Sequence, residues 1–460
     1  MNYLDVKHDD LNYEYLYGST YNLMKNAGKA VAEKVRKILE EGKKICVICG
    51  TGNNAGDSIV AAEDLRSNYD VTVLIISELK TDLAKRSLEE YKGKVCSIDD
   101  IDSCLKADLL IDGIFGVGIA GRPRPPYDAI IKKINQSGRK VVSVDVPSGM
   151  GSDLCVRADY TVTFSGIKDG MDRKNSGEIT VADIGITEDV AKYAGPGDLV
   201  YYPKADPSSH KGMNGTLAIV AGWEFFGSSV IAGLAAKHLG LDLVKIYVTD
   251  KNYEVVASYD PSIIVRKFEY GRSYFYDEVG NAKAVLLGPG MGISHDSIIA
   301  VKRIINSLTV PMVVDADALT IVSSHRDILK KHRIVITPHK GEFMKLTGMD
   351  ATEENAKLFS KEYGIITVLK GQTDIITDGQ ITRYARGGNS RMTMGGTGDL
   401  LAGIIASFMA KGIDPMRSAL MGTFLNKKAG EYAYIQKGYW YGIEDMISSI
   451  GQIMHQYTGL

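Results

Sequence analysis

The sequence has few cysteines and no excess of charge of either sign. Its five cysteines all lie within the first 155 residues, and so sparse and odd a set argues against a disulfide framework. Lys and Arg (54) nearly balance Asp and Glu (56), and no cluster of five basic residues occurs. This excludes the electrostatic footprint of a protein that binds nucleic acid or an anionic membrane.

Long apolar runs are also missing. No stretch reaches the roughly 18 uncharged apolar residues of a membrane span, and the first ten residues lack the apolar core of a signal peptide. We therefore expect a cytoplasmic protein with neither nucleic acid nor a membrane as partner. Cys46 and Cys49 form a C-x-x-C pair, but they lie in the apolar run 44–50, which predicts a buried strand rather than a redox site.

What the chain does contain is a regular alternation of apolar strands and helical segments. Its 45% hydrophobic and 24% charged residues are typical of a globular protein, and 460 residues predict two or three domains. The strand-like runs are 45–49, 71–76, 109–111 and 141–144, and then 216–221, 243–248, 284–287, 312–314, 335–336 and 366–369. This pattern predicts an α/β protein with two three-layer αβα domains, of which the N-terminal one has a Rossmann-like parallel sheet.

The periodicity fades between residues 185 and 210, where Gly195-Pro196-Gly197 and further prolines indicate a connection. We place the boundary there, with domains at 1–205 and 206–460. In such folds, binding sites lie at the carboxyl ends of the strands.

A glycine run precedes an apolar helix late in the chain. Gly395, Gly396 and Gly398 allow backbone amides to point at an anion beside the positive end of the helix. Asp399 follows in the first turn, where its carboxylate could serve as a base. The alternative is a glycine-rich turn capped by an ordinary helix-starting Asp.

Polar clusters also follow strands in both halves. In the N-terminal half they are 50–58, 112–122 and 145–149, which together offer carboxylate, amide and hydroxyl oxygens for a cation and one free acid or base. In the C-terminal half they are 288–292, 315–319, 337–342 and 369–374, a set that suits phosphoryl chemistry. Taken singly, each could be a loop with Asx turns, and His339 alone could be a helix-capping histidine.

The N-terminal motifs LMKNAG (23–28), GTGNNAGDS (50–58), DGIFGVGIAGRP (112–123) and VVSVDVPSG (141–149) resemble the NAD(P)H-hydrate epimerase domain. That domain interconverts the R and S forms of NADH or NADPH hydrated at carbon 6 of the nicotinamide ring. The resemblance implies a K⁺ ion held by Asn54, Asp112 and Ser148, and Asp145 as the catalytic acid or base. Ala55 stands where the family usually has glycine. The implied substrate contacts are Asn53, Asn54, Ala55, Gly56, Asp57, Gly116, Val117, Gly118, Ile119, Ala120, Gly121, Arg122 and Asp145.

The C-terminal half is similar to the ribokinase-like superfamily. Its series HKGMNG (210–215), GPGMG (288–292), VVDADAL (313–319), TPHKGEF (337–343), VLKG (368–371) and GGTGD (395–399) closely resembles the NAD(P)H-hydrate dehydratase domain. The resemblance implies a ribokinase-like sheet with Asp399 as catalytic base. Implied hydrate contacts are Ser228, Gly290, Gly292, His339 and Asp399, and implied nucleotide contacts are Lys370, Gly371, Gln372, Thr373, Asp374, Gly395, Gly396 and Gly398.

The two resemblances together imply a bifunctional metabolite-repair enzyme. We expect hydrated NADH or NADPH as substrate, ADP as co-substrate, Mg²⁺ with the nucleotide, and a homo-oligomeric assembly. The alternative is an ATP-dependent small-molecule kinase of the same superfamily, whose N-terminal half is a binding module without turnover.

Overall fold

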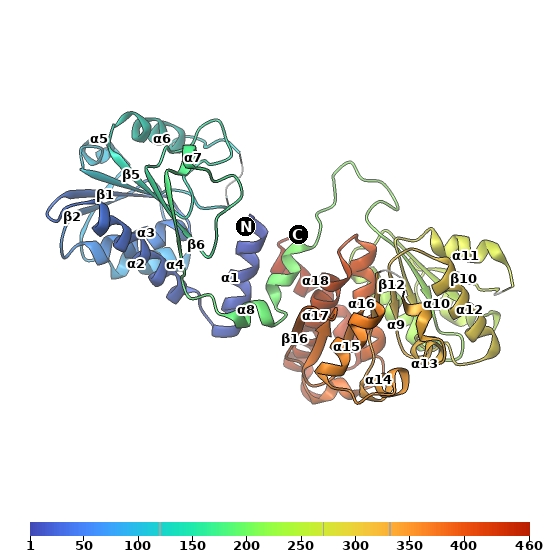
Figure 1. Ribbon diagram of the computed structural model, residues 1–460. Coiled ribbons are helices and arrows are strands. Elements are labelled where there is room, and N and C mark those ends of the chain that lie inside the picture. The colour runs from blue at the N-terminus through green and yellow to red at the C-terminus, as the bar shows by residue number, and fades with distance from the viewer. Residues whose placement is uncertain (119–120, 270, 331–332) are drawn as a thin grey trace. The chain divides into compact units, whose positions relative to one another are not determined.

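The computed structural model describes residues 1–118, 121–269, 271–330 and 333–460. The chain forms two compact units, Met1–Thr187 and Glu188–Leu460, and each is treated by itself below (Figure 1). None of the helices in these ranges has the length and apolar character needed to cross a membrane.

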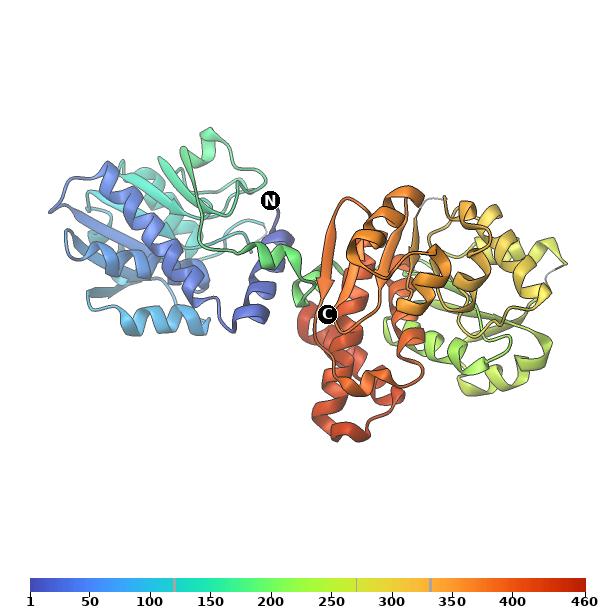
Figure 2. The same cartoon turned by 60° about the horizontal axis from the view of Figure 1, so that its bottom comes forward.

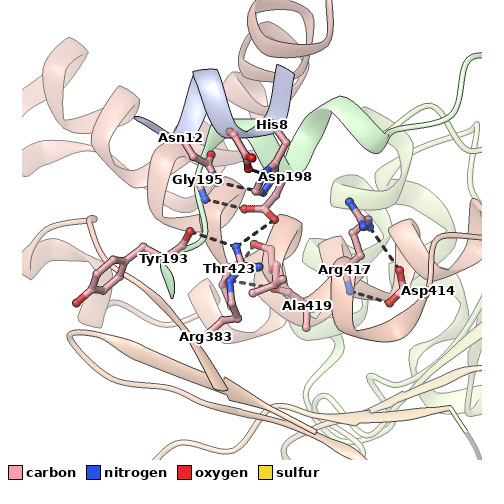
Figure 3. A network of polar contacts seen from close by, with 12 residues as sticks. His8, Asn12, Tyr193, Gly195, Asp198, Arg383, Asp414, Arg417, Ala419 and Thr423 are labelled. Atoms are coloured by element: carbon pink, nitrogen blue, oxygen red, sulfur yellow. Dashed lines mark hydrogen bonds and ion pairs between the residues drawn. The ribbon is translucent and has the colours of Figure 1, made fainter. Parts of the chain in front are cut away.

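The division falls earlier than the sequence boundary at 205/206. Helix α8 (Glu188–Lys192) contacts strand β16 (Thr382–Ala385), and the 3₁₀ helix η2 (Pro196–Tyr201) packs on helices of the second unit. Ala194 N–H donates to the Tyr384 carbonyl at 2.8 Å. Figure 3 shows Arg383 pointing toward Asp198, 3.8 Å away, and toward the Tyr193 carbonyl at 3.4 Å. Residues 188–201 therefore belong with the second unit, although they lack a periodic apolar pattern.

The first unit is a seven-stranded sheet with every strand parallel to its neighbours, as the βαβ pattern predicts. Its order is β3-β2-β1-β4-β5-β6-β7. The strands are β1 (Lys44–Cys49), β2 (Asp70–Ile75), β3 (Lys94–Ser97), β4 (Leu109–Gly113), β5 (Lys140–Val144), β6 (Tyr160–Phe164) and β7 (Glu178–Ala182). The helices are α1 (Tyr3–Tyr17), α2 (Tyr21–Ile38), α3 (Asn53–Leu65), α4 (Asp82–Glu90), η1 (Ile98–Asp100), α5 (Ile101–Cys104), α6 (Tyr127–Gln136) and α7 (Arg173–Ser176).

The centre of this sheet fixes the position of the first site. Strand β1 is buried along five of its six residues, and Cys46 and Cys49 are part of the core, as the apolar run predicts. The strand order reverses between β1 and β4, because the chain first moves outward to β2 and β3 and then returns to β4. A crevice at the carboxyl ends of the strands is expected at such a switch point.

The second unit is a nine-stranded sheet in the order β10-β9-β8-β11-β12-β13-β14-β15-β16, parallel except for the pairs β14-β15 and β15-β16. Its strands are β8 (Thr216–Val220), β9 (Leu243–Val248), β10 (Ile264–Lys267), β11 (Ala284–Leu287), β12 (Met312–Val314), β13 (Ile334–Ile336), β14 (Ile366–Leu369), β15 (Asp374–Thr377) and β16. Helices cover both faces of the sheet (Figure 2). They are α9 (Phe226–His238), α10 (Asp250–Tyr259), α11 (Ser273–Gly280), α12 (His295–Ser307), α13 (Asp317–Val322), η3 (Arg326–Leu329), α14 (Lys340–Thr347), α15 (Glu353–Tyr363), η4 (Ser390–Thr393), α16 (Thr397–Ala410), α17 (Pro415–Lys437), η5 (Gly438–Trp440) and α18 (Ile443–Thr458).

Helix α16 is the central helix of this unit. Every residue from Leu400 to Ala410 is buried, because α16 packs against α9, α17 and strands β11 and β12 together. Gly403 allows the approach of α9, since a Cβ there would lie 2.8 Å from the Ala232 Cα. The first turn of α16, with Asp399, is thus held rigidly at the carboxyl edge of the sheet.

Two candidate active sites

A cavity of about 500 Å³ opens at the carboxyl edge of the first sheet. Its wall includes seven of the sequence-predicted contacts: Asn53, Asn54, Asp57, Gly116, Val117, Gly118 and Asp145. Ile119 and Ala120 lie outside the described residues. The remaining wall comes from α1 and the residue Met1 before it, α2, the start of α4 and the loop after β6, with Thr51, Gly52, Ile114, Phe115, Ile184 and Ile186.

Four predicted contacts do not line this cavity. Ala55 is fully buried inside α3, so no positive φ is required there and the glycine-to-alanine departure causes no strain. Gly56 makes room for Met24, whose Cε would lie 2.6 Å from an added Cβ. Gly121 is outside the wall, and the exposed Arg122 pairs with Asp153 at 3.2 Å. Ala55 and Gly56 therefore serve helix packing in this structure.

Asp145 follows β5 with a φ of 63°, a left-handed conformation that is rare for residues other than glycine. Such strain costs on the order of 1–3 kcal/mol and is concentrated at functional positions. Its Oδ1 accepts hydrogen bonds from Thr163 Oγ1 (3.2 Å) and the Phe164 N–H (3.4 Å) and pairs with Lys168 Nζ at 2.5 Å. Lys168 is itself buried and donates to the Phe164 carbonyl at 2.6 Å. Lys168 was not predicted, because β6, the strand that it follows, lacks a continuous apolar run.

Two further acids face this ion pair. Burial raises the pKa of Asp57 well above its usual range, and the charges of Asp145 and Asp10 add to the shift. Burial likewise raises the pKa of Asp10 to about 6, assisted by the charges of Asp9 and Asp145. Asp10 lies on α1 and was not predicted, because nothing in the local sequence connects α1 with the strand ends.

The residues predicted to hold K⁺ surround the loop that follows β4. Asp112 is buried and accepts from Ser148 Oγ (2.6 Å), the Ser148 N–H (2.9 Å) and Ser143 Oγ (2.8 Å). Ser148 Oγ in turn accepts from the Phe115 N–H at 2.8 Å. Asn54 lies beside Gly116, and both polar atoms of its side chain are buried without a hydrogen-bond partner among the described residues. A buried amide of this kind needs a partner such as an ion, a ligand or a water molecule.

The second site lies at the first turn of α16. Gly396 precedes the helix with a φ of 95°, and Asp399 follows in its first turn. Burial raises the pKa of Asp399 to about 6; Asp315 adds to this shift, whereas a hydrogen bond from Ser228 and the charge of Lys370 oppose it. The structure therefore brings Asp399, Ser228 and Lys370 together from three separate elements. The strand-end argument predicts Lys370 beside Asp399, and the family resemblance implies Ser228.

Glycines after β11 complete this wall. Gly290 has a φ of 61°, and an added Cβ would lie 3.1 Å from Ser228 Oγ. The Gly292 N–H donates to Asp317 Oδ2 at 2.8 Å, which ties this loop to the first turn of α13. The predicted hydrate contacts Ser228, Gly290 and Asp399 thus lie at one edge of the sheet.

His339 is the N-cap of α14. Its Nδ1 accepts from the N–H groups of Gly341 (3.0 Å) and Glu342 (3.2 Å), and Glu342 Oε2 accepts from the His339 N–H at 2.8 Å. The capping interpretation is therefore correct, and the proton of the neutral ring is on Nε2. The side chain is 60% exposed, and its Nε2 lies 3.6 Å from Glu342 Oε2.

Lys370 lies between the acids Asp315 and Glu342 and the start of α16. Its ammonium lies 3.2 Å from Asp315 Oδ1 and 3.7 Å from Glu342 Oε2, and it would be 3.3 Å from a Cβ at Gly398. Burial opposes the charged form, but the attraction of Asp315, Glu342 and Asp399 outweighs it and raises the pKa of Lys370. A cation is thus fixed beside the N-terminus of α16.

A second cavity of about 470 Å³ adjoins Lys370. Of the predicted nucleotide contacts, Lys370, Gly371, Gln372, Asp374 and Gly398 line it, whereas Thr373, Gly395 and Gly396 do not. Residues that the sequence analysis did not assign also line it: Gly387, Gly388, Asn389, Ser390, Met392, Thr393, Thr397, Leu401, Asn426 and Lys427. The glycines 387 and 388 were visible as part of the glycine-rich stretch before α16, whereas Asn426 and Lys427 lie mid-helix in α17 and give no local signal.

An ion pair shapes the floor of this cavity. Lys427 Nζ lies 3.3 Å from Asp374 Oδ2 and donates to the carbonyls of Gly371 (3.3 Å) and Gln372 (3.2 Å). Asp374 Oδ1 accepts from the Gly371 N–H at 2.8 Å. Burial raises the pKa of Asp374, although Lys427 opposes the shift. The pair and these hydrogen bonds tie the loop 371–374 to α17.

Comparisons with known proteins cover both units. A family described as NAD(P)H-hydrate dehydratase matches residues 217–452, and one described as YjeF-related protein N-terminus matches residues 20–170. The ADP/ATP-dependent NAD(P)H-hydrate dehydratase of Bacillus subtilis has a similar fold, with a TM-score of 0.50 and 21% identity over 58% of this chain and 98% of that one. A ribokinase-like superfamily protein of Enterococcus faecalis gives a TM-score of 0.53 at 22% identity over 58% and 97%.

Full-length relatives extend this match to both units. The chain is 37% identical to the bifunctional NAD(P)H-hydrate repair enzyme Nnr of Archaeoglobus fulgidus, over 97% of this chain and 96% of that one. It is 34% identical to the enzyme of the same name from Methanothermobacter thermautotrophicus, over 98% and 94%. The chain therefore belongs to the family of bifunctional NAD(P)H-hydrate repair enzymes.

Proposed function

We propose that the first unit epimerises the R and S forms of hydrated NADH and NADPH, and that the second dehydrates the S form at the expense of ADP, giving AMP and phosphate. The observation that carries the second activity is the position of Asp399. This acid is held at a glycine-built helix N-terminus, between Ser228 and Lys370, beside a cavity of about 470 Å³. Family membership supports both activities.

In the second unit, Asp399 would deprotonate the hydroxyl on carbon 6 of the hydrate. The hydroxyl oxygen then attacks the terminal phosphorus of ADP, and AMP leaves. Lys370 and the amides at the start of α16 would stabilise the charge that develops on the transferred phosphoryl group. Loss of phosphate from carbon 6, with a proton from carbon 5, restores the dihydronicotinamide. Mg²⁺ would enter with the nucleotide, held mainly by phosphates and water as is usual for this ion.

In the first unit, the hydroxyl would leave carbon 6 with its electron pair, and the ring nitrogen would stabilise the resulting cation. Water then adds to the other face of the ring. Asp145 is the proposed acid or base, and Lys168 holds it in place at 2.5 Å. A K⁺ ion would be held by Asn54, Asp112 and Ser148, and it would supply a fixed positive charge at this edge of the cavity. The unpartnered amide of Asn54 supports this assignment.

Incubation of the purified protein with hydrated NADH and ADP tests the proposal. Recovery of dihydronicotinamide absorbance, together with AMP and phosphate, is the expected result. A small-molecule kinase would instead leave a stable phosphorylated product and no recovery of absorbance. That outcome would remove the dehydratase assignment.

The dehydration rate should depend on pH through Asp399. Because burial raises the pKa of this acid to about 6, the carboxylate that accepts the proton is lost as the pH falls through that value. We expect kcat/KM for dehydration to be half-maximal near pH 6 and to decrease about tenfold for each pH unit below it. Stopped assays of AMP formation in a constant-ionic-strength buffer measure this. A flat profile through that range would contradict the role of Asp399 as base.

Removal of the Asn54 amide should lower the rate of epimerisation without lowering the stability of the first unit. Asn54→Leu keeps the shape of the side chain but deletes two buried polar atoms without partners, so it should not lower the unfolding midpoint. The rate of epimerisation should fall by about tenfold or more, as is usual when an ion site is altered. The remaining rate should no longer depend on KCl. Rates in KCl and in choline chloride at equal ionic strength provide the comparison. Equal rates of the wild-type protein in both salts would exclude the K⁺ site.

A further inference from the structure

Helix α1 forms one wall of the epimerase cavity. Tyr3, Val6, Lys7, Asp9 and Asp10 of this helix line the cavity, together with Met1 just before it. The helix precedes the stretch 20–170 matched by the epimerase-related family. The position of α1 is fixed at its start, where the N-terminal ammonium donates to the Ile167 carbonyl at 3.1 Å and to Asp169 Oδ1 at 3.0 Å. These two partners flank Lys168, so α1 is tied to the loop that carries the cation of the site.

We propose that Asp10 is a second catalytic residue of this site, one that exchanges a proton with the carbon 6 oxygen on the ring face opposite to the one served by Asp145. The proposal rests on the proposed epimerase function and adds to it the group that this chemistry otherwise lacks. It gives α1 a part in the reaction as well as in enclosing the cavity.

The stereochemistry of the reaction requires two such groups. In one direction, the bond between carbon 6 and oxygen breaks with its electron pair on oxygen, and a proton from the Asp10 carboxyl converts the departing hydroxyl into water. The nitrogen lone pair forms the ring cation. Water then bonds to carbon 6 from the other face, and its proton passes to the Asp145 carboxylate. The reverse reaction exchanges the two roles, and exchange with solvent water restores the starting protonation, so no other reactant is consumed.

The two carboxyl groups reach the cavity from different walls. Asp145 stands at the end of β5, and its carboxylate is paired with Lys168 at 2.5 Å. Asp10 comes from α1. The charges of Asp145 and Lys168 act on it from the strand ends, and those of Asp9 and Glu14 act from its own helix. The charge of Asp10 in turn acts on Asp57. Burial keeps Asp10 protonated up to about pH 6, the pKa given by its surroundings.

Asp9 and Asp57 also line the cavity. Asp9 neighbours Asp10 on α1 and pairs with His8 Nδ1 at 2.8 Å, whereas the position of Asp57 differs. It belongs to the first turns of α3, directly after β1, and thus shares the carboxyl edge of the sheet with Asp145. A ring bound against that edge would present one face to both of these acids. Only a group on a separate wall, such as Asp10, reaches the second face.

The test follows the interconversion of pure R hydrate without ADP, with the two epimers separated by chromatography and the uncatalysed rate subtracted. Asp10→Asn keeps the shape of the side chain but cannot donate the proton. We expect it to lower kcat for epimerisation by about 100-fold or more, with KM nearly unchanged, whereas Asp10→Glu recovers most of the rate. Glu33→Gln, which removes the same charge from an exposed position on α2 outside the cavity wall, is the matched control and should behave as wild type.

The pH profile separates catalysis from packing. Since the proton donor is lost above its pKa, wild-type kcat/KM for epimerisation should decrease as the pH rises above about 6, and Asp10→Asn should show no such decrease. Thermal unfolding of the variant, followed by circular dichroism beside the wild type, confirms that its first unit is folded. If the wild type epimerises and Asp10→Asn matches its rate and profile, or is slow but keeps the decrease, the role of Asp10 is excluded while the proposed function stands. A wild-type protein without epimerase activity would overturn both.

Discussion

Asp399→Asn is expected to lower dehydration of S hydrate by on the order of 10³-fold and to leave epimerisation of R hydrate at the wild-type rate. The amide has the shape of the carboxylate and can still accept the hydrogen bond from Ser228, but it cannot take a proton from the hydroxyl on carbon 6. The two activities separate because Asp399 belongs to the second unit, and the residues of the epimerase cavity all belong to the first. AMP formation and chromatographic separation of the epimers measure the two rates on one preparation.

Asp296→Asn is the matched control for this substitution. Asp296 also stands in the first turn of a helix, α12, but it is exposed and lines neither cavity. It should retain both activities. Loss of both activities in an Asp399→Asn protein that still folds would show that the two sites are not separate, and dehydration at the wild-type rate would remove Asp399 from the reaction.

The edges of both sheets could be predicted from the sequence because buried parallel strands leave a clear apolar signal. The runs 45–49 and 109–111 became β1 and β4, and the polar residues after them, such as Asn54 and Asp112, now surround one cavity or its floor. Likewise, the run 366–369 forms β14, and Lys370, which follows it directly, lies close enough to Asp399 for its charge to act on that acid. Asp112 and Lys370 directly follow the predicted apolar runs 109–111 and 366–369, and Asn54 lies five residues after the run 45–49, so local sequence was sufficient.

Other residues were out of reach of the sequence analysis for physical reasons. Strand β6 alternates polar and apolar residues, Tyr160-Thr-Val-Thr-Phe164, and the exposed strand β3 has no apolar run, so neither gave the signal of a buried strand. Lys168, four residues beyond β6, was missed with it. Asp10 and Lys427 reach their cavities through tertiary packing of α1 and α17, which no local pattern records.

The fold also decided between interpretations that the sequence left open. Ala55 could replace a glycine without strain because the loop ends earlier than expected and α3 already begins at Asn53. His339 was found to cap α14, a role that any residue with a suitable acceptor at that position can take. Both outcomes depend on where a helix begins, and helix boundaries are the least predictable feature of a sequence.

Asp374→Ala is expected to destabilise the second unit and to impair ADP binding together. Lys427 and Asp374 are 9% and 8% exposed, so removal of the carboxylate leaves a buried ammonium without its counter-charge. Loss of one partner of a buried pair costs about 3–5 kcal/mol. The loop 371–374 also loses the bond from the Gly371 N–H to Asp374, and we expect the KM for ADP to rise by about 100-fold, or roughly 2.7 kcal/mol.

Unfolding of the second unit can be followed separately because both tryptophans of the chain, Trp223 and Trp440, lie in it and Trp223 is buried. Asp250→Ala, which breaks the exposed pair with Lys267 at 2.6 Å, is the control and should change the urea midpoint little. The double variant Asp374→Asn, Lys427→Met removes both charges and should recover most of the stability, because the unpaired charge causes the loss. It should not recover ADP affinity, since both side chains line the nucleotide cavity. If the double variant bound ADP as the wild type does, the pair would be only a structural support, and the nucleotide would be held by other residues of that cavity.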